Sequence, residues 1–263
     1  MSRLLRYLWP EVSLRAAFRV WQRDVTVYKR TYKLNIIPNF FEPVLYLVGM
    51  GFGLGAYVAT INGYPYLAFI APGLLATSVM WGAALETTYN VFVKMNFDKT
   101  YDGILSTPVN PRDAALGELL WGTTRAMIYG GAFYIVLLFF GFGHHWTSLF
   151  IIPVMALGGF MFAGIGLLFT SFIKEIELYN YFFTLFLTPL FLFSGIFFPL
   201  DHWSPIFQYV AWCTPLYHLV QVSRGLLLDT WTADLWISVV WILMVVSINF
   251  LIVVEKFHRR LYV

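Results

Sequence analysis

Charged residues are scarce in this sequence. Asp, Glu, Lys and Arg make up 12% of the 263 residues, whereas hydrophobic residues make up 59%. A soluble domain usually carries about 25% charged residues, so the composition excludes an ordinary water-soluble fold. The net charge of +3 is small, and its basic residues flank apolar runs. We therefore expect a membrane protein that binds membrane lipid and no nucleic acid.

Disulfides, nucleotide motifs and clustered metal ligands are also missing. The single cysteine, Cys213, excludes an intrachain disulfide framework. No G-x-x-x-x-G-K-S/T run occurs, which excludes a P-loop and ATP hydrolysis by this chain. His144 and His145 are adjacent, and no Cys, Asp or Glu cluster accompanies them. We expect no catalytic residue, no metal site and no cofactor on this chain.

Long apolar runs are what the sequence does contain. A run of about 18 or more apolar residues can cross the hydrocarbon core of a bilayer as a helix. Six segments predict such helices, at roughly 38–60, 66–93, 114–142, 149–173, 178–200 and 233–254. All but two of the 17 Lys and Arg residues fall on one side if six helices alternate in direction. This bias predicts that both termini are cytoplasmic.

The segment before the first run is predicted to be a cytoplasmic arm, residues 1–37, ahead of a transmembrane domain, residues 38–263. A helical spacing of four and three residues places an apolar face on the arm, made of Leu14, Phe18, Trp21, Val25, Tyr28 and Tyr32. Arginines lie largely off that face, which favours an amphipathic helix at the membrane interface. The alternative is a helix that packs on a soluble partner.

The loop KMNFDKTYDGILSTPVNPR, residues 94–112, predicts a short helix on the cytoplasmic side. Asn96 or Asp98 would cap this helix, which would end before Pro108. Asn110 and Pro111 would begin the next helix as N-cap and first-turn proline. Such a helix, held between two spans, would present a rigid knob to a partner; the alternative is a solvated connector.

The apolar stretch between the fifth and sixth runs is divided by Pro199, Pro205 and Pro215. Residues 205–213 and 216–228 predict two helices that are too short to span a bilayer. We predict a re-entrant extracytoplasmic hairpin that acts as a gate.

Two charges are expected inside the spans. Glu86 and Arg125 lie on antiparallel helices at depths that differ by about one turn of roughly 5.4 Å, so their side chains could meet. Buried charges in lipid are costly unless they are paired, which indicates either function or the packing of two helices. Glycines at 49, 51, 53 and 55 lie four apart in pairs, which allows close helix approach within the chain or between two copies.

The chain resembles the type-2 ABC exporter permeases over its whole length. Residues 99–126, KTYDGILSTPVNPRDAALGELLWGTTRA, look like the cytoplasmic coupling segment of that family. LTPLFLFSGIFFPL at 187–200 and TPLYHLVQVSRGLLL at 214–228 look like its fifth span and outer hairpin. Within the family, the chain is similar to permeases that export lipid-linked saccharides, including lipo-oligosaccharide nodulation signals.

The resemblance implies a half-transporter of six spans that pairs with a second copy and with two copies of a separate ATPase, which binds ATP and Mg. It implies an ATPase-coupling segment made of Asp98, Lys99, Thr100, Tyr101, Asp102, Ile104 and Leu105. A second cytoplasmic contact would comprise Lys174, Glu175 and Glu177. The exit hairpin would include Trp203, Tyr209, Trp212, Tyr217, His218 and Arg224.

We therefore expect an all-α permease subunit in a bacterial inner membrane that exports an amphiphile, such as a glycolipid, lipo-oligosaccharide or lipid-linked polysaccharide. Efflux of drugs or small lipophilic molecules is an alternative within the same family. A lipid-modifying membrane enzyme would need a polar constellation near one membrane face, and the sequence offers none. A non-transporting assembly factor is a further alternative.

Overall fold

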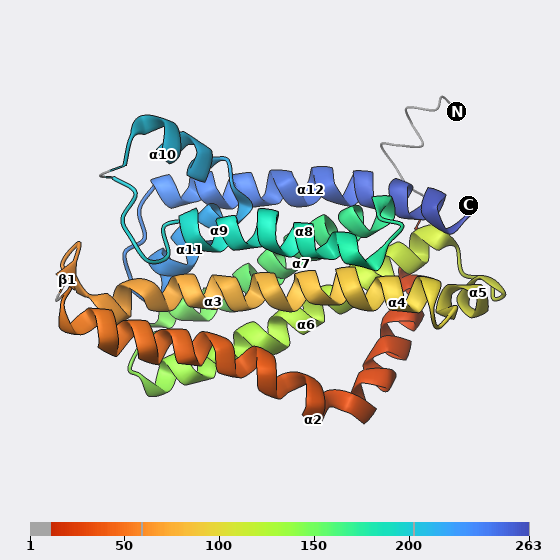
Figure 1. Ribbon diagram of the computed structural model, residues 1–263, viewed down its shortest axis with the longest axis horizontal. Coiled ribbons are helices and arrows are strands. Elements are labelled where there is room, and N and C mark those ends of the chain that lie inside the picture. Colours follow the sequence, from red (N-terminus) through yellow and green to blue (C-terminus); the bar gives the residue numbers. More distant parts are fainter. Residues whose placement is uncertain (1–11, 59, 202, 263) are drawn as a thin grey trace.

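The computed structural model describes residues 12–58, 60–201 and 203–262, with the backbone alone for residues 31–40 and 42. Long helices run side by side along the molecule (Figure 1). In chain order, the helices are α2 (Leu14–Gly53), η1 (Leu54–Ala56), α3 (Tyr66–Leu85), η2 (Glu86–Asn90), α4 (Val91–Asn96), α5 (Thr100–Leu105), α6 (Pro111–Phe139), η3 (Trp146–Phe150), α7 (Ile151–Phe172), η4 (Ile176–Leu178), α8 (Tyr179–Tyr181), η5 (Phe182–Leu187), α9 (Thr188–Phe193), α10 (Pro205–Trp212), α11 (Pro215–Leu227) and α12 (Asp234–Leu261). The described strands, β1 (Thr60–Ile61) and β2 (Tyr64–Pro65), form one antiparallel hairpin.

Five of these helical stretches are long and apolar enough to cross a membrane: Tyr66–Asn96, Pro111–Phe139, Trp146–Phe172, Ile176–Phe193 and Asp234–Leu261. The first predicted run, 38–60, corresponds to a shorter apolar stretch, Pro43–Ala56, in the last part of α2 and in η1. The predicted boundary at residues 37 and 38 falls inside α2, which bends between its two parts (Figure 1). An all-α membrane fold is therefore confirmed, and the sixth span stays a prediction.

Helix α3 forms the centre of the bundle. Nearly all of its side chains are buried, and it contacts α2, α6, α7 and α11. A helix that is apolar on every side is expected in such a position, because it has no face left for solvent. The outer helices expose large apolar side chains such as Leu45, Phe139 and Val240, which suits a lipid surround.

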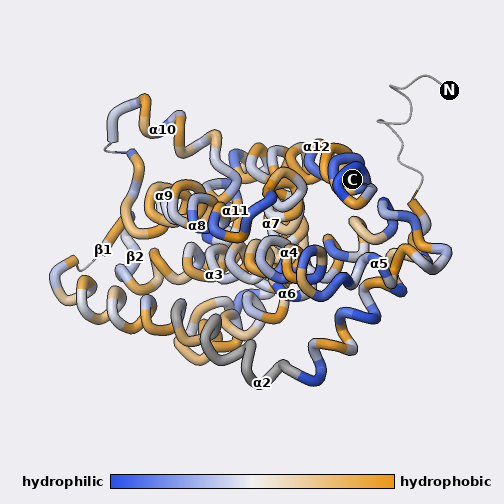
Figure 2. Tube along the Cα trace, turned by 45° about the vertical axis from the view of Figure 1, so that its right-hand side comes forward, coloured by the Kyte–Doolittle hydropathy of each residue, from blue (hydrophilic) through white to orange (hydrophobic). Residues whose placement is uncertain are grey.

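Two ends of the molecule can be distinguished (Figure 1). The start of α2, α5 and the last turns of α12 lie at one end, here called the α5 end. The β hairpin and α10 lie at the opposite end, called the β1 end. Hydrophilic residues gather around α5, the first part of α2 and the end of α12 (Figure 2).

Several predicted helix ends can be checked against the structure. Asn110 caps α6 as predicted: its side chain accepts from the Arg112 N–H, and Asp113 accepts from the Asn110 N–H in a capping box. The proposed caps Asn96 and Asp98 are wrong. Lys99 stands at the N-cap of α5 with φ 52°, so the chain enters α5 through a left-handed turn and not through a side-chain cap.

The segment between the fifth helical stretch and α12 contains the two short helices that the prolines predicted, α10 and α11. Its re-entrant position in the membrane stays a prediction. The fifth helical stretch is shorter than the predicted run 178–200, because α9 ends at Phe193. Gly195 follows with φ 72°, a conformation that glycine adopts without steric cost. Residues 194–200 therefore form a non-helical link to the hairpin.

Glycines set the closest helix contacts. A Cβ on Gly51 would clash with Leu67 of α3, whereas positions 49 and 53 have no heavy atom within 4 Å. The Gly51 face therefore makes an intrachain contact, and the Gly49 and Gly53 face remains open. On α6, a Cβ on Gly117 would lie 2.6 Å from the Val20 Cβ and 2.9 Å from the Ala17 carbonyl oxygen of α2.

This contact yields a stability prediction. Gly117→Ala should destabilise the chain by about 1–3 kcal/mol, because the added methyl group forces α2 away from α6. Gly131→Ala on the same helix has open space and should be neutral, or stabilising by up to about 1 kcal/mol through helix propensity. Thermal unfolding of both purified variants in the same detergent measures the difference. Equal melting temperatures for the two variants would contradict the close α2–α6 contact.

Candidate functional site

Glu86 and Arg125 are brought together in the bundle. Arg125 Nε lies 3.0 Å from Glu86 Oε2, and both side chains are almost completely buried. Asn90 donates a hydrogen bond of 2.8 Å to the same carboxylate oxygen. The Arg125 guanidinium also lies over the rings of Tyr28, at 4.3 Å, and Tyr129, at 4.9 Å. Pairing and ring contacts offset part of the cost of removing these charges from water.

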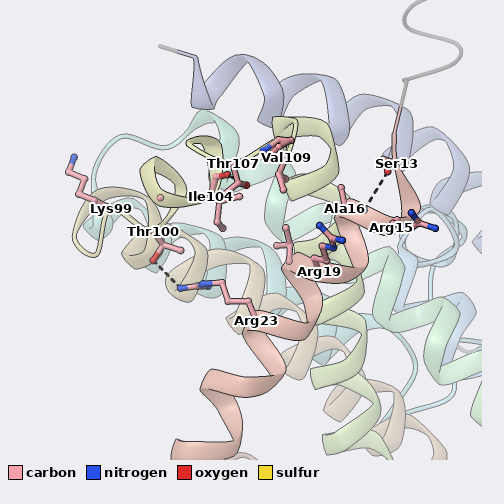
Figure 3. A pocket seen from close by; sticks show the side chains of 13 residues that line it. Ser13, Arg15, Ala16, Arg19, Arg23, Lys99, Thr100, Ile104, Thr107 and Val109 are labelled. Atoms are coloured by element: carbon pink, nitrogen blue, oxygen red, sulfur yellow. Dashed lines mark hydrogen bonds between the residues drawn. The ribbon is translucent and has the colours of Figure 1, made fainter.

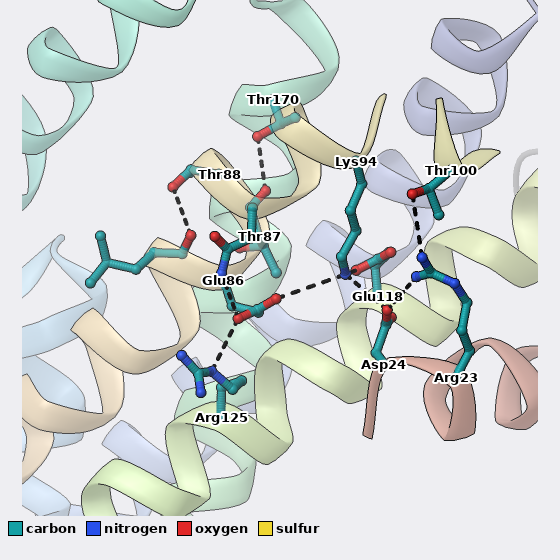
Figure 4. Close-up of polar contacts among 12 residues, drawn as sticks. Arg23, Asp24, Glu86, Thr87, Thr88, Lys94, Thr100, Glu118, Arg125 and Thr170 are labelled. Carbon is teal, nitrogen blue, oxygen red and sulfur yellow. Dashed lines mark hydrogen bonds and ion pairs between the residues drawn. The ribbon is translucent and has the colours of Figure 1, made fainter. Parts of the chain in front are cut away.

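Glu86 begins η2, a turn wound as a π-helix inside the long stretch from α3 to α4. Such turns are rare and are frequently found at functional sites, since they redirect side chains and free backbone groups. Here the Thr87 carbonyl accepts a 2.8 Å hydrogen bond from the Thr170 hydroxyl of α7 (Figure 4). The turn is therefore held from a neighbouring helix.

The Glu86–Arg125 pair belongs to a larger network of charged side chains, whose carboxylates are all buried (Figure 4). Its second cation is Lys94 of α4, whose Nζ lies 2.9 Å from Glu118 Oε2 and 3.2 Å from Asp24 Oδ1. Glu86 Oε1 lies 3.8 Å from the same ammonium group. Arg23 then pairs with Asp24 at 2.7 Å. We call these side chains the charge network: Arg23, Asp24, Glu86, Lys94, Glu118 and Arg125.

Formal charges in the charge network cancel, because each cation is matched by a carboxylate. Glu118 is fully buried and Asp24 is 3% exposed. Buried ions are tolerated when they are paired and hydrogen-bonded, and removing one partner leaves an uncompensated charge. The network joins α2, η2, α4 and α6, so it fixes the relative position of helices that are distant in sequence.

Helix α5 is attached to this network through its first two residues. The Tyr101 hydroxyl donates a 2.7 Å hydrogen bond to Glu118 Oε1, and the Tyr101 ring meets Phe257 of α12 edge-on. Burial and the Glu118 carboxylate raise the pKa of Tyr101 well above its usual range, so the hydroxyl keeps its proton and donates. Arg23 donates to the Thr100 hydroxyl at 3.3 Å. A displacement of α5 therefore acts directly on buried charges.

A groove of about 690 Å³ separates the first part of α2 from α5 (Figure 3). Arg15, Arg19 and Arg23 line it from α2, and Lys99 lines it from the start of α5. No Asp or Glu occurs among its described lining residues. The groove is therefore strongly basic and is open at the α5 end.

The predicted coupling residues do not all face outward. Lys99, Thr100 and Ile104 line the groove. Asp98 and Asp102 are exposed, Leu105 is half-buried, and Tyr101 is 2% exposed and points into the protein. Tyr101 is therefore placed to act inside the molecule, where a partner protein does not reach it.

The predicted second contact lies in the turn after α7 and in η4, which follows it. Lys174, Glu175 and Glu177 are all exposed there. The turn is tied to the last part of α12, because Arg260 donates a 3.1 Å hydrogen bond to the Ile173 carbonyl. It thus lies at the α5 end, beside the last turns of α12.

The residues of the predicted exit hairpin divide into three environments. Tyr209 and Trp212 are exposed, and Trp203 and Tyr217 are half-buried. His218 is fully buried: Nε2 meets the Trp212 carbonyl at 2.6 Å, and Nδ1 meets Ser238 Oγ at 3.0 Å. Both ring nitrogens of His218 are therefore engaged in contacts that connect α10, α11 and α12.

Arg224 of α11 has a different environment. Its Nη2 donates to the Gly195 carbonyl at 2.8 Å and to the Phe69 carbonyl at 3.4 Å. These bonds hold the non-helical link after α9 against α3. The guanidinium lies 4.0 Å from the centre of the Phe69 ring.

Lys94, Asp24 and Glu118 were not predicted as site residues. Lys94 and Glu118 come close to the ends of apolar runs, where charges are ordinary. A signal existed for Asp24, because Ala17, Val20 and Asp24 share one helical face at spacings of three and four. That face packs closely on α6. Part of the predicted aromatic face also reaches α6, because Trp21 Nε1 donates a 2.9 Å hydrogen bond to the Thr124 hydroxyl and the Tyr28 ring meets Trp121 edge-on. Leu14 and Phe18 remain exposed. Within the described part of the chain, no group of three or more metal-ligating side chains comes together.

Fold and site together define a multi-helix membrane protein with one strongly charged end and no catalytic constellation among the described residues. Comparison with known families makes the class specific, because residues 15–228 match the ABC-2 type transporter family. The chain belongs to this family of membrane-embedded transporter components.

Curated relatives agree with the family. Nodulation protein J of Sinorhizobium fredii (strain NBRC 101917 / NGR234) is 38% identical over 80% of each chain. Nodulation protein J of Rhizobium leguminosarum bv. viciae is 32% identical over 92% of this chain and 93% of the relative. The inner membrane transport permease YadH of Escherichia coli (strain K12) is 24% identical over 78% of this chain and 80% of the relative.

The charge network predicts a non-additive response to mutation. Lys94→Met should destabilise the chain by about 3–5 kcal/mol, because three carboxylates lose their shared cation. Adding Glu118→Gln should restore part of the loss, since the amide oxygen can still accept from Tyr101. Lys174→Met, at an exposed position, is the matched control and should change stability little. Unfolding of the purified variants in detergent gives all three values; a Lys94→Met chain as stable as the wild type would refute the network's role.

Proposed function

We propose that the chain is the permease half of an ATP-driven exporter in a bacterial inner membrane, with six spans and both termini in the cytoplasm. A second copy would complete the path, and two copies of a separate ATPase would supply the energy. The observation that carries the proposal is the basic groove beside α5, because its lining residue Arg23 bonds both to Thr100 of α5 and to Asp24 of the charge network. The sixth span would be the last part of α2 with η1.

The groove supports a docking site for the ATPase. A short element of the ATPase would lie between α2 and α5 and present carboxylates to Arg15, Arg19 and Lys99. Charge complementarity of this kind steers association and fixes the register of a complex. ATP and Mg would be bound by the ATPase alone. The exposed turn with Lys174, Glu175 and Glu177 would be a smaller second contact.

Coupling would run from α5 into the bundle by rigid contacts. When the ATPases close on ATP, α5 would move with them. Tyr101 would transmit that motion to Glu118 of α6, and Lys94 would carry it to α4 and η2. A packed protein interior switches between two discrete arrangements under such a displacement and does not deform continuously.

We propose an amphiphile as substrate, with lipo-oligosaccharide as the first candidate. Support comes from the relatives named nodulation protein J and from the resemblance to exporters of lipid-linked saccharides. The substrate would leave past α10 and α11, which would form a re-entrant hairpin in the outer leaflet. A second candidate, efflux of small lipophilic molecules, is favoured by an apolar groove of about 400 Å³ along α7, α8 and η5, which Phe169, Phe172 and Phe182 line.

Co-purification tests the proposal directly. The tagged chain, isolated from its native host in mild detergent, should retain a stoichiometric P-loop ATPase. Arg19→Glu should reduce the retained ATPase at least about tenfold, because it places a carboxylate in the basic groove opposite the partner's carboxylates. Arg30→Glu, an exposed reversal on the same helix outside the groove, is the matched control.

Outcomes separate the parts of the proposal. Loss of the ATPase in Arg19→Glu but not in Arg30→Glu would support docking in the groove. Equal retention in both variants would place the ATPase elsewhere. A wild-type chain that purifies without any ATPase would overturn the exporter proposal and favour the assembly-factor alternative.

A further inference from the structure

A second cavity, of about 370 Å³, lies among the β hairpin, the start of α3, the link after α9 and α11. It shares no lining residue with the groove beside α5. The β hairpin, which contributes to its lining, lies at the end of the molecule opposite α5 (Figure 1). Aromatic side chains contribute to its wall, notably Phe69 and Phe198. Tyr217, Gln221 and Arg224 face it from α11 at spacings of four and three, so one side of that helix supplies hydrogen-bonding groups.

Arg224 gives this cavity a cation without a counter-charge. Its Nε is buried and has no hydrogen-bond partner. Among the described residues, no carboxylate lies within 4.0 Å of its guanidinium, whose bonds go to two backbone carbonyls. By contrast, Lys94, Arg112 and Arg125 each have a carboxylate at 3.0 Å or less.

An unpaired cation at this position is costly, since the protein and lipid surroundings replace water poorly. Two carbonyl dipoles and one ring face compensate only part of a full charge. A guanidinium with free N–H groups beside a cavity matches the oxygens of a phosphate, sulfate or carboxylate. Tyr217 and Gln221 can each donate a further hydrogen bond to such a group.

Asp201 is the acidic residue that lines the same cavity. It is exposed and lies beyond 4.0 Å from Arg224, so it does not neutralise the guanidinium at contact distance. Its negative charge would oppose an anion in the cavity at longer range. It would instead help to bind a neutral sugar, because a carboxylate accepts hydrogen bonds from hydroxyl groups. Removing the charge of Arg224 should therefore weaken the binding of an anionic ligand, whereas removing the charge of Asp201 should strengthen it.

We propose that this cavity binds the anionic headgroup of the amphiphile that the transporter exports, with Arg224 as the counter-charge. The inference rests on the proposed export function and specifies the substrate class at the β1 end: an amphiphile whose headgroup carries phosphate, sulfate or carboxylate. The headgroup would be held between α11 and the link after α9.

Binding to the purified full-length chain in phosphatidylcholine nanodiscs tests the proposal without ATPase or transport. The probes are dihexanoyl phosphatidate, dihexanoyl phosphatidylcholine and inorganic phosphate, each titrated by calorimetry. Phosphatidate should bind, and the other two should bind at least about tenfold more weakly, because one lacks net charge and the other lacks the apolar part. Arg224→Gln should weaken phosphatidate binding at least about tenfold, whereas Arg224→Lys should retain most of it.

Asp201→Asn provides the discriminating variant. It should tighten phosphatidate binding a few-fold, because a like charge is removed while the side chain keeps its shape. Weaker binding in this variant would indicate a neutral polar ligand and overturn the proposal. So would phosphatidate binding that is unaffected by Arg224→Gln, or inorganic phosphate that binds as tightly as phosphatidate. Melting temperatures of each variant identify loss of fold, and Arg224→Lys with Asp201→Asn still test the charge if Arg224→Gln is unstable.

The binding result and the co-purification result are independent. A chain that retains its ATPase but binds no anionic probe would overturn the headgroup site and leave the export function standing. A chain that binds the probe through Arg224 but retains no ATPase would overturn the export function, and the site would then hold an anionic membrane amphiphile.

Discussion

The Lys94 ammonium group is the point on which the arrangement of this protein depends. Its side chain is only 14% exposed, so water solvates the charge poorly, and three carboxylates from three parts of the chain meet it there. Asp24 brings the first part of α2, Glu86 brings the π-helical turn, and Glu118 brings α6. Because each carboxylate would itself be costly without the cation, none of these elements can move away alone. Electrostatic pairing thus determines how helices from distant segments are placed.

Small residues make that pairing possible. Helices must approach closely for short carboxylate side chains to converge, and a Cβ at Gly117 would collide with Val20 on α2. Likewise, Gly166 of α7 lies against Thr87, so that Thr170 can donate to the Thr87 carbonyl beside Glu86. In a lipid surround, where apolar surface gains little from helix association, such close backbone contact and polar bonding drive packing. Small residues and charged side chains therefore stabilise the same contacts between helices: the small residues allow the helices to approach, and the charges pair across them.

Much of this fold follows from local sequence signals. Apolar length located five of the spanning helices, prolines divided α10 from α11, and Asn110 with Pro111 marked the start of α6. Partners across the bundle could not be predicted in the same way, because periodicity defines a face and not what covers it. The arm shows this: its aromatic face was evident, but the sequence did not show that Leu14 and Phe18 of that face stay exposed, or that the small face of Ala17 and Val20 makes the close contact with α6. Glu86 and Arg125 could be matched only because both lie deep within antiparallel spans.

The two ends of the bundle differ in how their charges are compensated, and that difference is mechanically useful. At the α5 end, the network is formally neutral, so it can be displaced as a unit without transferring net charge into a poorer solvent. Tyr101 connects this unit to α5 by a short hydrogen bond in the interior, where such bonds are strong. At the hairpin, Arg224 instead holds the non-helical link through backbone carbonyls and keeps its charge uncompensated. A formally neutral network at one end and an unpaired cation at the other are suited to different tasks: in the proposed mechanism, the first would transmit displacement and the second would bind a charged ligand.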